Sequence, residues 1–428
     1  MWNLGDFFRP LFIFLILTIT CKSFGQSVMK RSPIYVVLLT VFIDLLGFGI
    51  IIPLLPFYAE HFGATPVVIG LLTAAYSFMQ FLFVPFWGRL SDRIGRRPII
   101  LISVFGSFIS YLMFGFAGSL TVLFISRLLA GFMGANISTA NAYIADSTSF
   151  DERAKYMGII GAAFGVGFML GPFTGGIMSK LSYGAPGFLA SGLSLINLVF
   201  AYFGLPESLN SRSEKSRRIS LFNFSAVREA FKRPAIGSLV MVFFFYTIAF
   251  STLYVAFPLF TGEVFKYGAE ANGYIFAYIG LVGILVQGGA TGRLVKRFGE
   301  KALLITGVAL LFAGLTFVPL VHTLTPLLIL ITLLAIGSAL VTPSLNSLLS
   351  KYAGDGRHGS VLGVSSSFSS LARVLGPFWG GFIISTAGIT WPFYTGSVML
   401  LAALFFALKI RRLSPPPVEA AAVGATSE

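Results

Sequence analysis

The amino-acid sequence predicts an all-α membrane protein in which twelve transmembrane helices form two pseudo-symmetric six-helix bundles. The first observation behind this prediction is composition, because 56% of the 428 residues are hydrophobic and only 11% are charged. A typical soluble domain has about 25% charged residues. The second observation is a series of apolar runs long enough to cross a bilayer, and the third is an internal repeat. Together they exclude a large soluble domain.

The apolar runs follow one another along the chain and are separated by short polar turns. A helix of about twenty residues crosses the ~30 Å hydrocarbon layer and satisfies its own backbone hydrogen bonds, so it is the expected spanning element. We predict spans at 34–57, 66–87, 98–117, 120–144, 155–179, 186–204, 236–260, 271–291, 302–321, 325–348, 359–386 and 389–410.

Basic residues are concentrated in alternate loops. Most of the 30 Lys and Arg residues fall on the face that carries Lys30 and Arg31, whereas the opposite loops hold Lys180 and Lys266. An excess of Lys and Arg is the usual mark of cytoplasmic loops. We therefore predict a multi-pass protein of the inner (cytoplasmic) membrane with both chain ends in the cytoplasm. The formal charge of +14 follows from this topology, so no nucleic-acid partner is expected.

The longest internal polar stretch divides the predicted spans into two groups of six. The basic segment 206–235 is predicted to be a cytoplasmic linker between an N-terminal half at 30–205 and a C-terminal half at 236–412. The tail at 413–428 is rich in Pro and Ala and is predicted to be disordered.

The first residues, 1–29, are predicted to be an N-terminal extension. Their apolar run is too short to span a membrane unaided, and cleavage of a signal peptide here would invert the charge pattern. We expect the natural start at Met29, with an extra interfacial helix as the alternative.

Two sequence segments recur at nearly the same offset. GRLSDRIG at 88–95 returns as GRLVKRFG at 292–299, and LGPFTGG at 170–176 returns as LGPFWGG at 375–381. A shared offset indicates a duplicated six-helix unit, and parallel repeats of this kind occur in secondary transporters.

Four segments have distinctive patterns: the loop 2–3 run from Gly88 to Arg97, Arg127 with Gly131 in the fourth span, the fifth-span glycine run from Gly158 to Gly176, and DLLGFGIIIPLLP from Asp44 to Pro56. They match motifs of the major facilitator superfamily, which the chain resembles over residues 30–412, and specifically its drug:proton antiporters with twelve spans. The run YSFMQFLFVPFWGRLSDRIGRRP is similar to bacterial tetracycline and multidrug efflux carriers.

The resemblance implies the major facilitator fold and a secondary active transporter. It would export an organic, drug-like amphipathic compound in exchange for protons by alternating access, as a monomer and not as an enzyme. Its partners would be a small organic substrate, protons and the lipid bilayer. No cofactor is expected, and the absence of a Walker A sequence argues against ATP as the energy source.

Two other functions stay open at this point. One is a proton-coupled symporter of a sugar or organic acid, although the fifth-span glycine motif favours antiport. The other is an intramembrane lipid-modifying enzyme, which would need clustered carboxylates or a metal motif that Asp151 and Glu152 alone do not supply. The single cysteine, Cys21, and the dispersed histidines predict no metal site. No acidic residue lies within spans seven to twelve, a departure from tetracycline carriers.

The charged loop between the second and third spans is predicted to be a conformational latch. Ion pairs in a short loop strengthen when water is excluded and weaken when water enters, which suits a contact that closes one side of a carrier. The resemblance implies that Asp92 faces the N-terminal end of the eleventh span. Arg96 is placed to pair with Asp146. The predicted latch residues are Gly88, Asp92, Arg93, Gly95, Arg96, Arg97 and Asp146.

Glycines in the fifth and eleventh spans are predicted to form close helix crossings, because small residues spaced by four let another backbone approach. A proline in each run favours a bend. The resemblance implies that the fifth span packs on the eighth and the eleventh on the second. The antiporter motif comprises Gly158, Gly167, Gly171, Pro172, Gly175 and Gly176, and the second-half motif comprises Gly376, Pro377 and Gly380.

Asp44 and Arg127 are the predicted proton-coupling residues. Asp44 lies about ten residues into its span, roughly 15 Å deep, and an Asp at that depth costs about 2.5–3.5 kcal/mol on insertion scales. Such residues usually mark proton or ion paths. Arg127 lies at a similar depth, so protonation of Asp44 would release Arg127 while substrate competes for the same charge. The alternative is that Asp44 and Arg127 form a static buried ion pair with no role in coupling.

Polar and aromatic side chains within the spans are predicted to line a substrate cavity. An aromatic pocket with few polar anchors suits flat amphipathic molecules. The candidates are Gln80, Asn136, Asn141, Tyr246, Tyr254, Gln287, Asn346 and Arg373, and Arg373 fits either the cavity or the latch.

Overall fold

The computed structural model describes residues 32–134, 136–209, 224–353 and 358–413, and these residues are almost entirely helical. The extension at 1–29, its proposed start at Met29 and the tail from 414 onward lie outside the described residues. The helices of the first part of the chain are α2 (Ser32–Ile51), α3 (Leu55–His61), α4 (Pro66–Ile94), α5 (Arg96–Gly115), α6 (Leu120–Met133), α7 (Asn136–Ser147), α8 (Phe150–Ser179) and α9 (Ala185–Gly204).

The second part of the chain begins with a short helix in the segment predicted to be a linker. Its helices are α10 (Phe224–Lys232), α11 (Pro234–Val264), α12 (Ala269–Leu285), the π-helical turn η1 (Val286–Ala290), α13 (Thr291–Phe298), α14 (Glu300–Phe317), the 3-10 turn η2 (Val318–Leu320), α15 (Leu324–Ala353), α16 (His358–Ala387) and α17 (Trp391–Arg411).

Among the described residues, eleven helical segments are long and apolar enough to cross a membrane. The remaining predicted span, 359–386, corresponds to α16, which has 30 residues but carries many serines and Arg373. Its polarity reflects its position, because one face of α16 lines an internal cavity instead of lipid. The all-helical, twelve-span fold is therefore confirmed. The serine-rich helix, α16, is one that lines the cavity.

The first predicted span, 34–57, is interrupted. Helix α2 ends at Ile51 and α3 begins at Leu55, with Pro53 between them. Proline has no N–H to donate to the preceding turn and its ring clashes with the helix backbone, so it ends the helix here.

The fourth predicted span, 120–144, is divided between α6 and α7 at Gly134. Side chains of α4 hydrogen-bond to the backbone at this break: Gln80 Nε2 donates to the Gly134 carbonyl at 3.3 Å, and Trp87 Nε1 donates to the Phe132 carbonyl at 2.6 Å. These bonds satisfy carbonyls near the end of α6, which is why the chain tolerates a break inside a membrane span.

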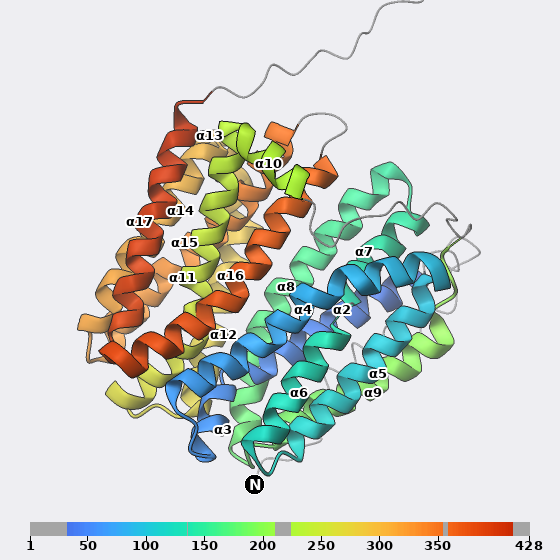
Figure 1. Cartoon of the computed structure of the whole chain (residues 1–428), viewed down its shortest axis with the longest axis horizontal. Helices are drawn as coiled ribbons and strands as arrows, with labels where there is room; N and C mark the ends of the chain where they lie inside the picture. Colours follow the sequence, from blue (N-terminus) through green and yellow to red (C-terminus); the bar gives the residue numbers. More distant parts are fainter. Residues whose placement is uncertain (1–31, 135, 210–223, 354–357, 414–428) are drawn as a thin grey trace, which may run out of the picture.

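The helices of 32–204 and those of 224–411 form two groups with matching internal packing (Figure 1). In the first group α2 packs on α8 and α9, and α5 packs on α9. In the second group α11 packs in the same way on α16 and α17, and α14 packs on α17. The repeated sequence segments therefore correspond to a repeated arrangement of helices.

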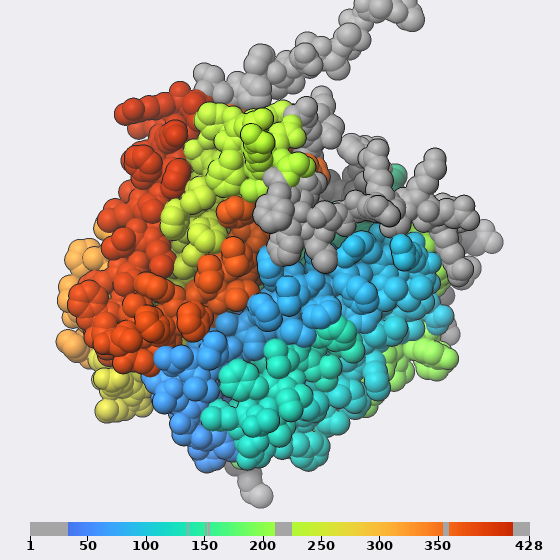
Figure 2. Space-filling model, viewed as in Figure 1, coloured from blue at the N-terminus to red at the C-terminus, as the bar shows by residue number. Residues whose placement is uncertain are grey.

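The two groups meet where α4 crosses α16 and where α8 crosses α12. Figure 2 shows the blue beginning of α4 directly against the orange-red α16. We call the end of the molecule with Arg89–Arg97, Arg293–Lys301 and Lys409–Arg412 the basic face, and the opposite end, with His61 and Lys180, the far face.

Both crossings lie toward the far face and use the glycine–proline segments of the repeat. A Cβ placed on Gly273 of α12 would lie 2.5 Å from the Pro172 carbonyl oxygen, and a Cβ on Gly70 of α4 would lie 2.6 Å from the Pro377 carbonyl oxygen. An ion pair joins the same ends, with Lys180 Nζ 2.8 Å from Glu270 Oε1. The two groups are therefore closed against each other at the far face.

Toward the basic face the same helices are apart. A Cβ on any of seven glycines there would meet no atom within 4 Å: Gly158, Gly161, Gly288, Gly289, Gly292, Gly359 and Gly363. Among the described residues, the two groups are thus in contact at the far face and apart at the basic face.

Candidate functional site

A cavity of about 1490 Å³ lies between the two groups of helices. Its wall extends from Ile51 and Thr73, near the far-face crossings, to Arg89, Val227 and Gly359 near the basic face. The first group contributes residues of α2 and α4 to α8, and the second contributes residues of α10, α11 and α16. Its volume exceeds that of ordinary ligand pockets, about 300–1,000 Å³, so a drug-sized molecule fits with water around it.

Asp44 of α2 and Arg127 of α6 both line this cavity. Arg127 is only 3% exposed, and its Nε and Nη2 atoms have no hydrogen-bond partner among the described residues. Its guanidinium instead packs over aromatic rings, 5.8 Å from the ring centre of Tyr111 and 5.1 Å from that of Phe114. The cation is thus held deep in the first group by ring faces, an arrangement that is favourable when water is excluded.

Aromatic side chains form the apolar part of the wall around Asp44. The ring of Phe48 lies 5.0 Å from that of Tyr76 and 5.9 Å from that of Phe168. Tyr76 shares the cavity wall with Asp44, Arg127 and Arg373. Sequence reasoning missed Tyr76 and Tyr111, although Tyr76 lies in the same span as the predicted cavity residue Gln80.

The other predicted cavity residues fall into two sets. Gln80, Asn141, Tyr254 and Arg373 line the cavity. Tyr246, Gln287 and Asn346 are not among its lining residues; Tyr246 hydrogen-bonds to Ser338 of α15 at 2.8 Å, and Gln287 lies in the π-helical turn. The side chain of Asn136 lies outside the described residues.

Arg373 belongs to the cavity and is accessible to solvent there, although it lies deep in the molecule. Its Nη1 donates to Ser369 Oγ and its Nη2 to Ser370 Oγ, each at 3.0 Å. Ser370 lines the cavity together with three further serines of α16, Ser360, Ser366 and Ser367. The sequence signal for this polar face was the serine-rich run at 360–370 inside a membrane-length helix.

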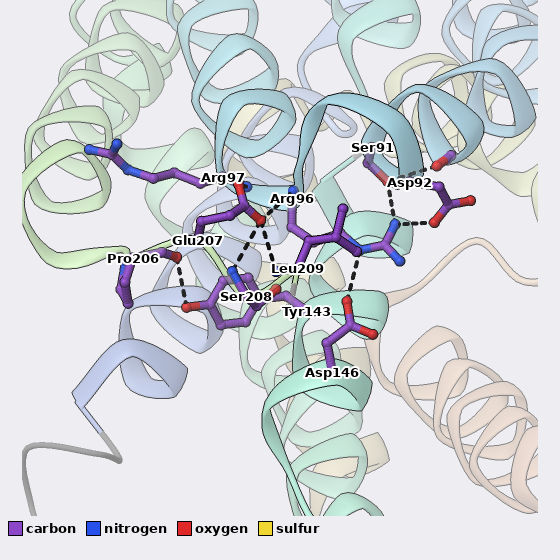
Figure 3. Close-up of polar contacts among 11 residues, drawn as sticks. Ser91, Asp92, Arg96, Arg97, Tyr143, Asp146, Pro206, Glu207, Ser208 and Leu209 are labelled. Atoms are coloured by element: carbon purple, nitrogen blue, oxygen red, sulfur yellow. Dashed lines mark hydrogen bonds and ion pairs between the residues drawn. The ribbon is translucent and has the colours of Figure 1, made fainter. Parts of the chain in front are cut away.

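At the basic face, Arg96 is the centre of an ion-pair cluster within the first group (Figure 3). It is 8% exposed, with Nη1 2.5 Å from Asp92 Oδ1, Nε 3.0 Å from Asp146 Oδ2, and Nη1 2.6 Å from Ser91 Oγ. The Asp92 side chain is 52% exposed. The residues just before α16, 354–357, lie outside the described residues, so the contact of Asp92 with that helix stays a prediction.

The remaining predicted latch residues surround this cluster. Gly95 has φ 114°, a left-handed conformation that favours glycine, and it separates α4 from α5. Arg93 is exposed, and a Cβ placed on Gly88 would have no atom within 4 Å. Arg97 Nη2 donates to the Tyr202 carbonyl at 2.7 Å.

Glu207, which sequence reasoning missed, caps the beginning of α5 (Figure 3). Its Oε1 accepts from the Arg96 backbone N–H at 2.8 Å, and its Oε2 accepts from that of Arg97 at 3.2 Å. Oε1 also accepts from the N–H groups of Ser208 and Leu209. An acid at a helix N-terminus satisfies donors that have no partner within the helix. The first residues after α9 are thereby tied to the latch loop.

We expect Glu207→Gln to lower the free energy of unfolding by about 1 kcal/mol, because the amide NH₂ group would face a backbone N–H donor. Thermal unfolding of the detergent-solubilised protein measures this change. The control is Glu263→Gln, which neutralises an exposed carboxylate at the end of α11. Equal melting temperatures for the two variants would show that the cap contributes nothing.

The fifth-span glycines face two different helices. A Cβ on Gly167 or Gly171 would contact α2, at 3.0 Å from Leu45 Cβ and 2.7 Å from Gly49 Cα, whereas Gly176 faces α12. Gly175 also faces α2, and Gly158 meets nothing. The predicted contact with the eighth span is thus made by Pro172 and Gly176, while most of the motif packs within the first group.

The eleventh-span motif repeats this division. Gly376 and Gly380 face α11, where Thr252 Oγ1 donates to the Gly376 carbonyl at 3.0 Å. Pro377 faces Gly70 of α4. Each proline therefore lies at a crossing between the groups, and each preceding glycine packs within its own group.

The model of the Major Facilitator Superfamily matches residues 37–291 and 288–426 of this chain. The "Tetracycline resistance protein, class C" of Escherichia coli is 32% identical over 369 residues, 85% of this chain and 92% of that protein. The "Multidrug resistance protein 2" of Bacillus subtilis (strain 168) is 31% identical over 385 residues, 88% of this chain and 95% of that protein.

Among solved structures, the human organic anion transporter MFSD10 (TETRAN) superposes with a TM-score of 0.66 and 27% identity. The match covers 88% of this chain and 99% of that one. The chain is thus similar over nearly its full length to multi-pass membrane transporters.

Proposed function

Because this chain belongs to the major facilitator superfamily, we propose that it exports an organic, amphipathic compound across the cytoplasmic membrane in exchange for protons, by alternating access. The observation that carries the proposal is the cavity between the two groups, which contains Asp44 and Arg127 and is closed only at the far face. A carrier of this kind needs a central site that each side of the membrane reaches in turn.

The positive-inside pattern supports a cytoplasmic basic face. In this orientation the cavity is open to the cytoplasm, the side from which an exporter takes its substrate. The domain division proposed above, with a cytoplasmic linker at 206–235 and both ends in the cytoplasm, agrees with the same orientation.

The chemistry of the wall supports an amphipathic organic substrate. Aromatic side chains such as Phe48, Phe168 and Phe368 provide apolar surface, and the serines of α16 provide hydrogen-bonding groups. The names of the relatives, which refer to tetracycline and multidrug resistance and to organic anions, all concern organic molecules.

Proton coupling is assigned to Asp44. A charged carboxylate is disfavoured in surroundings of low dielectric constant, and protonation removes the charge. Asp44 is therefore suited to accept and release protons as its surroundings change. A substrate that interacts with the charged form of Asp44 would bind better after the proton has left. Proton and substrate would then occupy the cavity in turn, which is the requirement for exchange.

The cluster around Arg96 is proposed to close the basic face in the opposite state. In the state described here it lies within the first group, with Asp92 half-exposed. Closing the basic face would bring Asp92 toward the beginning of α16 and exclude water from the ion pairs, which strengthens them.

The test uses inside-out vesicles with an acidic lumen and a pH-sensitive dye. A compound that exchanges for protons releases them from the lumen when it is added outside. We expect at least one compound from a panel of tetracyclines, cationic dyes and lipophilic drugs to do so, and Asp44→Asn to abolish the release at equal expression. Glu263→Gln serves as the control and should behave as the parent. Proton release that persists in Asp44→Asn would contradict the assignment.

A second candidate is proton-coupled symport of an organic acid. It is favoured by the arginines on the cavity wall, since among the described lining residues Arg89, Arg127 and Arg373 are accompanied by a single acid, Asp44. The same vesicles separate the two functions, because symport into the lumen would add protons to it instead of removing them.

A further inference from the structure

Arg373 is an accessible cation in the cavity that has no acidic partner among the described residues. Its guanidinium hydrogen-bonds to Ser369 and Ser370, and none of the ion pairs in the described part of the chain involves it. The phenols of Tyr76 and Tyr254 line the same cavity and are uncharged at neutral pH. The acids in the described part of the second group are Glu229, Glu263, Glu270 and Glu300, and none of them lines the cavity.

The two serines hold the guanidinium in a fixed direction. They lie one turn before Arg373 on α16, so the side chain is directed back along the helix toward the basic face, where the cavity opens. A guanidinium has five N–H donors, of which the serines take one from each Nη. The Nε–H and the second N–H of each Nη are left for a ligand, in the geometry that binds oxyanions in a bidentate manner.

Alternating access makes an unpaired cation at this position costly. When the basic face closes, the cavity loses its contact with bulk water, and an isolated buried charge is strongly disfavoured unless it is paired. Arg373 is solvated now only because the cavity is open. A counter-charge must therefore enter before closure, and the substrate is the group that enters.

We propose that Arg373 binds an anionic group of the substrate, such as a carboxylate, and so determines which compounds the cavity accepts. This inference rests on the proposed transport function and identifies the substrate class of the same cavity. Exchange at Asp44 requires the substrate to compete with a proton there, which a basic group does. The expected substrate is therefore an aromatic, amphoteric compound with an acidic group on Arg373 and a basic group toward Asp44.

The test compares four fluorescent compounds with one aromatic body. They are a piperazinyl-quinolone carboxylic acid, its methyl ester, its N-acetyl derivative, and the N-acetyl methyl ester, which carry both charges, only the cation, only the anion, and neither. Binding is measured on the full chain in lipid nanodiscs, with empty nanodiscs as the blank. The variants are Arg373→Gln, Arg373→Lys and, as a matched control on an exposed arginine of α17, Arg411→Gln.

The amphoteric acid should bind the parent about tenfold or more tightly than its methyl ester, as expected for a lost charge-assisted hydrogen bond. Arg373→Gln should weaken binding of the two acids by about that factor and leave the two esters unchanged. Arg373→Lys should retain most of the preference, and Arg411→Gln all of it. The two esters should still bind Arg373→Gln, so their binding distinguishes loss of the anion site from misfolding of the variant.

Equal binding of acid and ester by the parent would overturn the anion site. An unchanged preference for the acid in Arg373→Gln would do the same, and so would the failure of any acid to bind at millimolar concentration. Proton release in the vesicle assay is read independently with the same compounds. A preserved acid preference without proton release would overturn the proposed exchange and retain the anion site. Proton release driven by both acid and ester, together with equal binding of the two by the parent, would retain the exchange and overturn the anion site.

Discussion

Replacing Gly273 by leucine is expected to keep the far-face ends of the two groups apart and to reduce transport by about tenfold or more. A Cβ at this position would lie 2.5 Å from the Pro172 carbonyl oxygen and 2.7 Å from Gly176 Cα, so the obstacle is backbone on both sides. Overpacking a tight contact costs about 1–3 kcal/mol, and about 1.4 kcal/mol corresponds to a tenfold change in an equilibrium constant. The cost falls on the closed far face alone.

Accessibility of the cavity from the far side measures this shift. Thr73 lines the cavity near the crossings, and Cys21 is the single native cysteine, so Thr73→Cys in a Cys21→Ser background gives one thiol to label. A membrane-impermeant maleimide added to intact cells should modify Thr73→Cys slowly in the parent background and rapidly when Gly273→Leu is added.

A matched control lies ten residues further along the same chain segment. Gly283 is also in α12, but a Cβ there would meet nothing within 4 Å. Gly283→Leu should retain transport and the slow labelling. Gly70→Leu, at the repeat-related crossing of α4 with α16, should reproduce the effect of Gly273→Leu. Normal transport in Gly273→Leu would show that this crossing does not hold the far face closed.

Removing the Arg96 side chain is expected to produce the second large effect. Arg96→Ala leaves the carboxylates of Asp92 and Asp146 without their shared cation, which in a buried setting costs about 3–5 kcal/mol. Both acids are partly solvated here, with 52% and 30% of their side chains exposed. We therefore expect the free energy of unfolding to fall by about 2–3 kcal/mol.

Thermal unfolding in detergent and transport in vesicles report on this variant together. The melting temperature should fall by several degrees, and transport should fall further, because the same ion pairs are proposed to close the basic face. Arg411→Ala is the matched control, since Arg411 is an exposed arginine at the same face and is not one of the predicted latch residues. If both alanine variants melt and transport alike, the cluster around Arg96 has no special role.

The amino-acid sequence by itself determined that the protein spans the membrane and how its spans repeat. Hydrophobic runs of spanning length, the alternation of basic loops and the repeated glycine–proline segments are local properties, and each reports directly on helices in lipid. Within this framework the sequence also singled out Asp44, Arg127 and Arg373, because charged residues inside a span are costly and therefore rare.

Helix interruptions were less accessible to sequence reasoning. The division of the fourth span at Gly134 depends on Gln80 and Trp87, which donate to the Gly134 and Phe132 carbonyls from another helix. A break inside the membrane is tolerated only when such partners exist, and no local pattern around Gly134 reveals them.

Only the tertiary structure decided which predicted residues share a wall and which side of the carrier is closed. Arg373 and Arg127 come from different groups of helices, and Glu207 caps a helix more than one hundred residues earlier in the chain. Gly176 and Gly175 are neighbours in sequence, yet one faces α12 and the other α2. Such contacts arise from how packed helices rotate and cross, and hydropathy and spacing along a single chain carry no information about a partner surface.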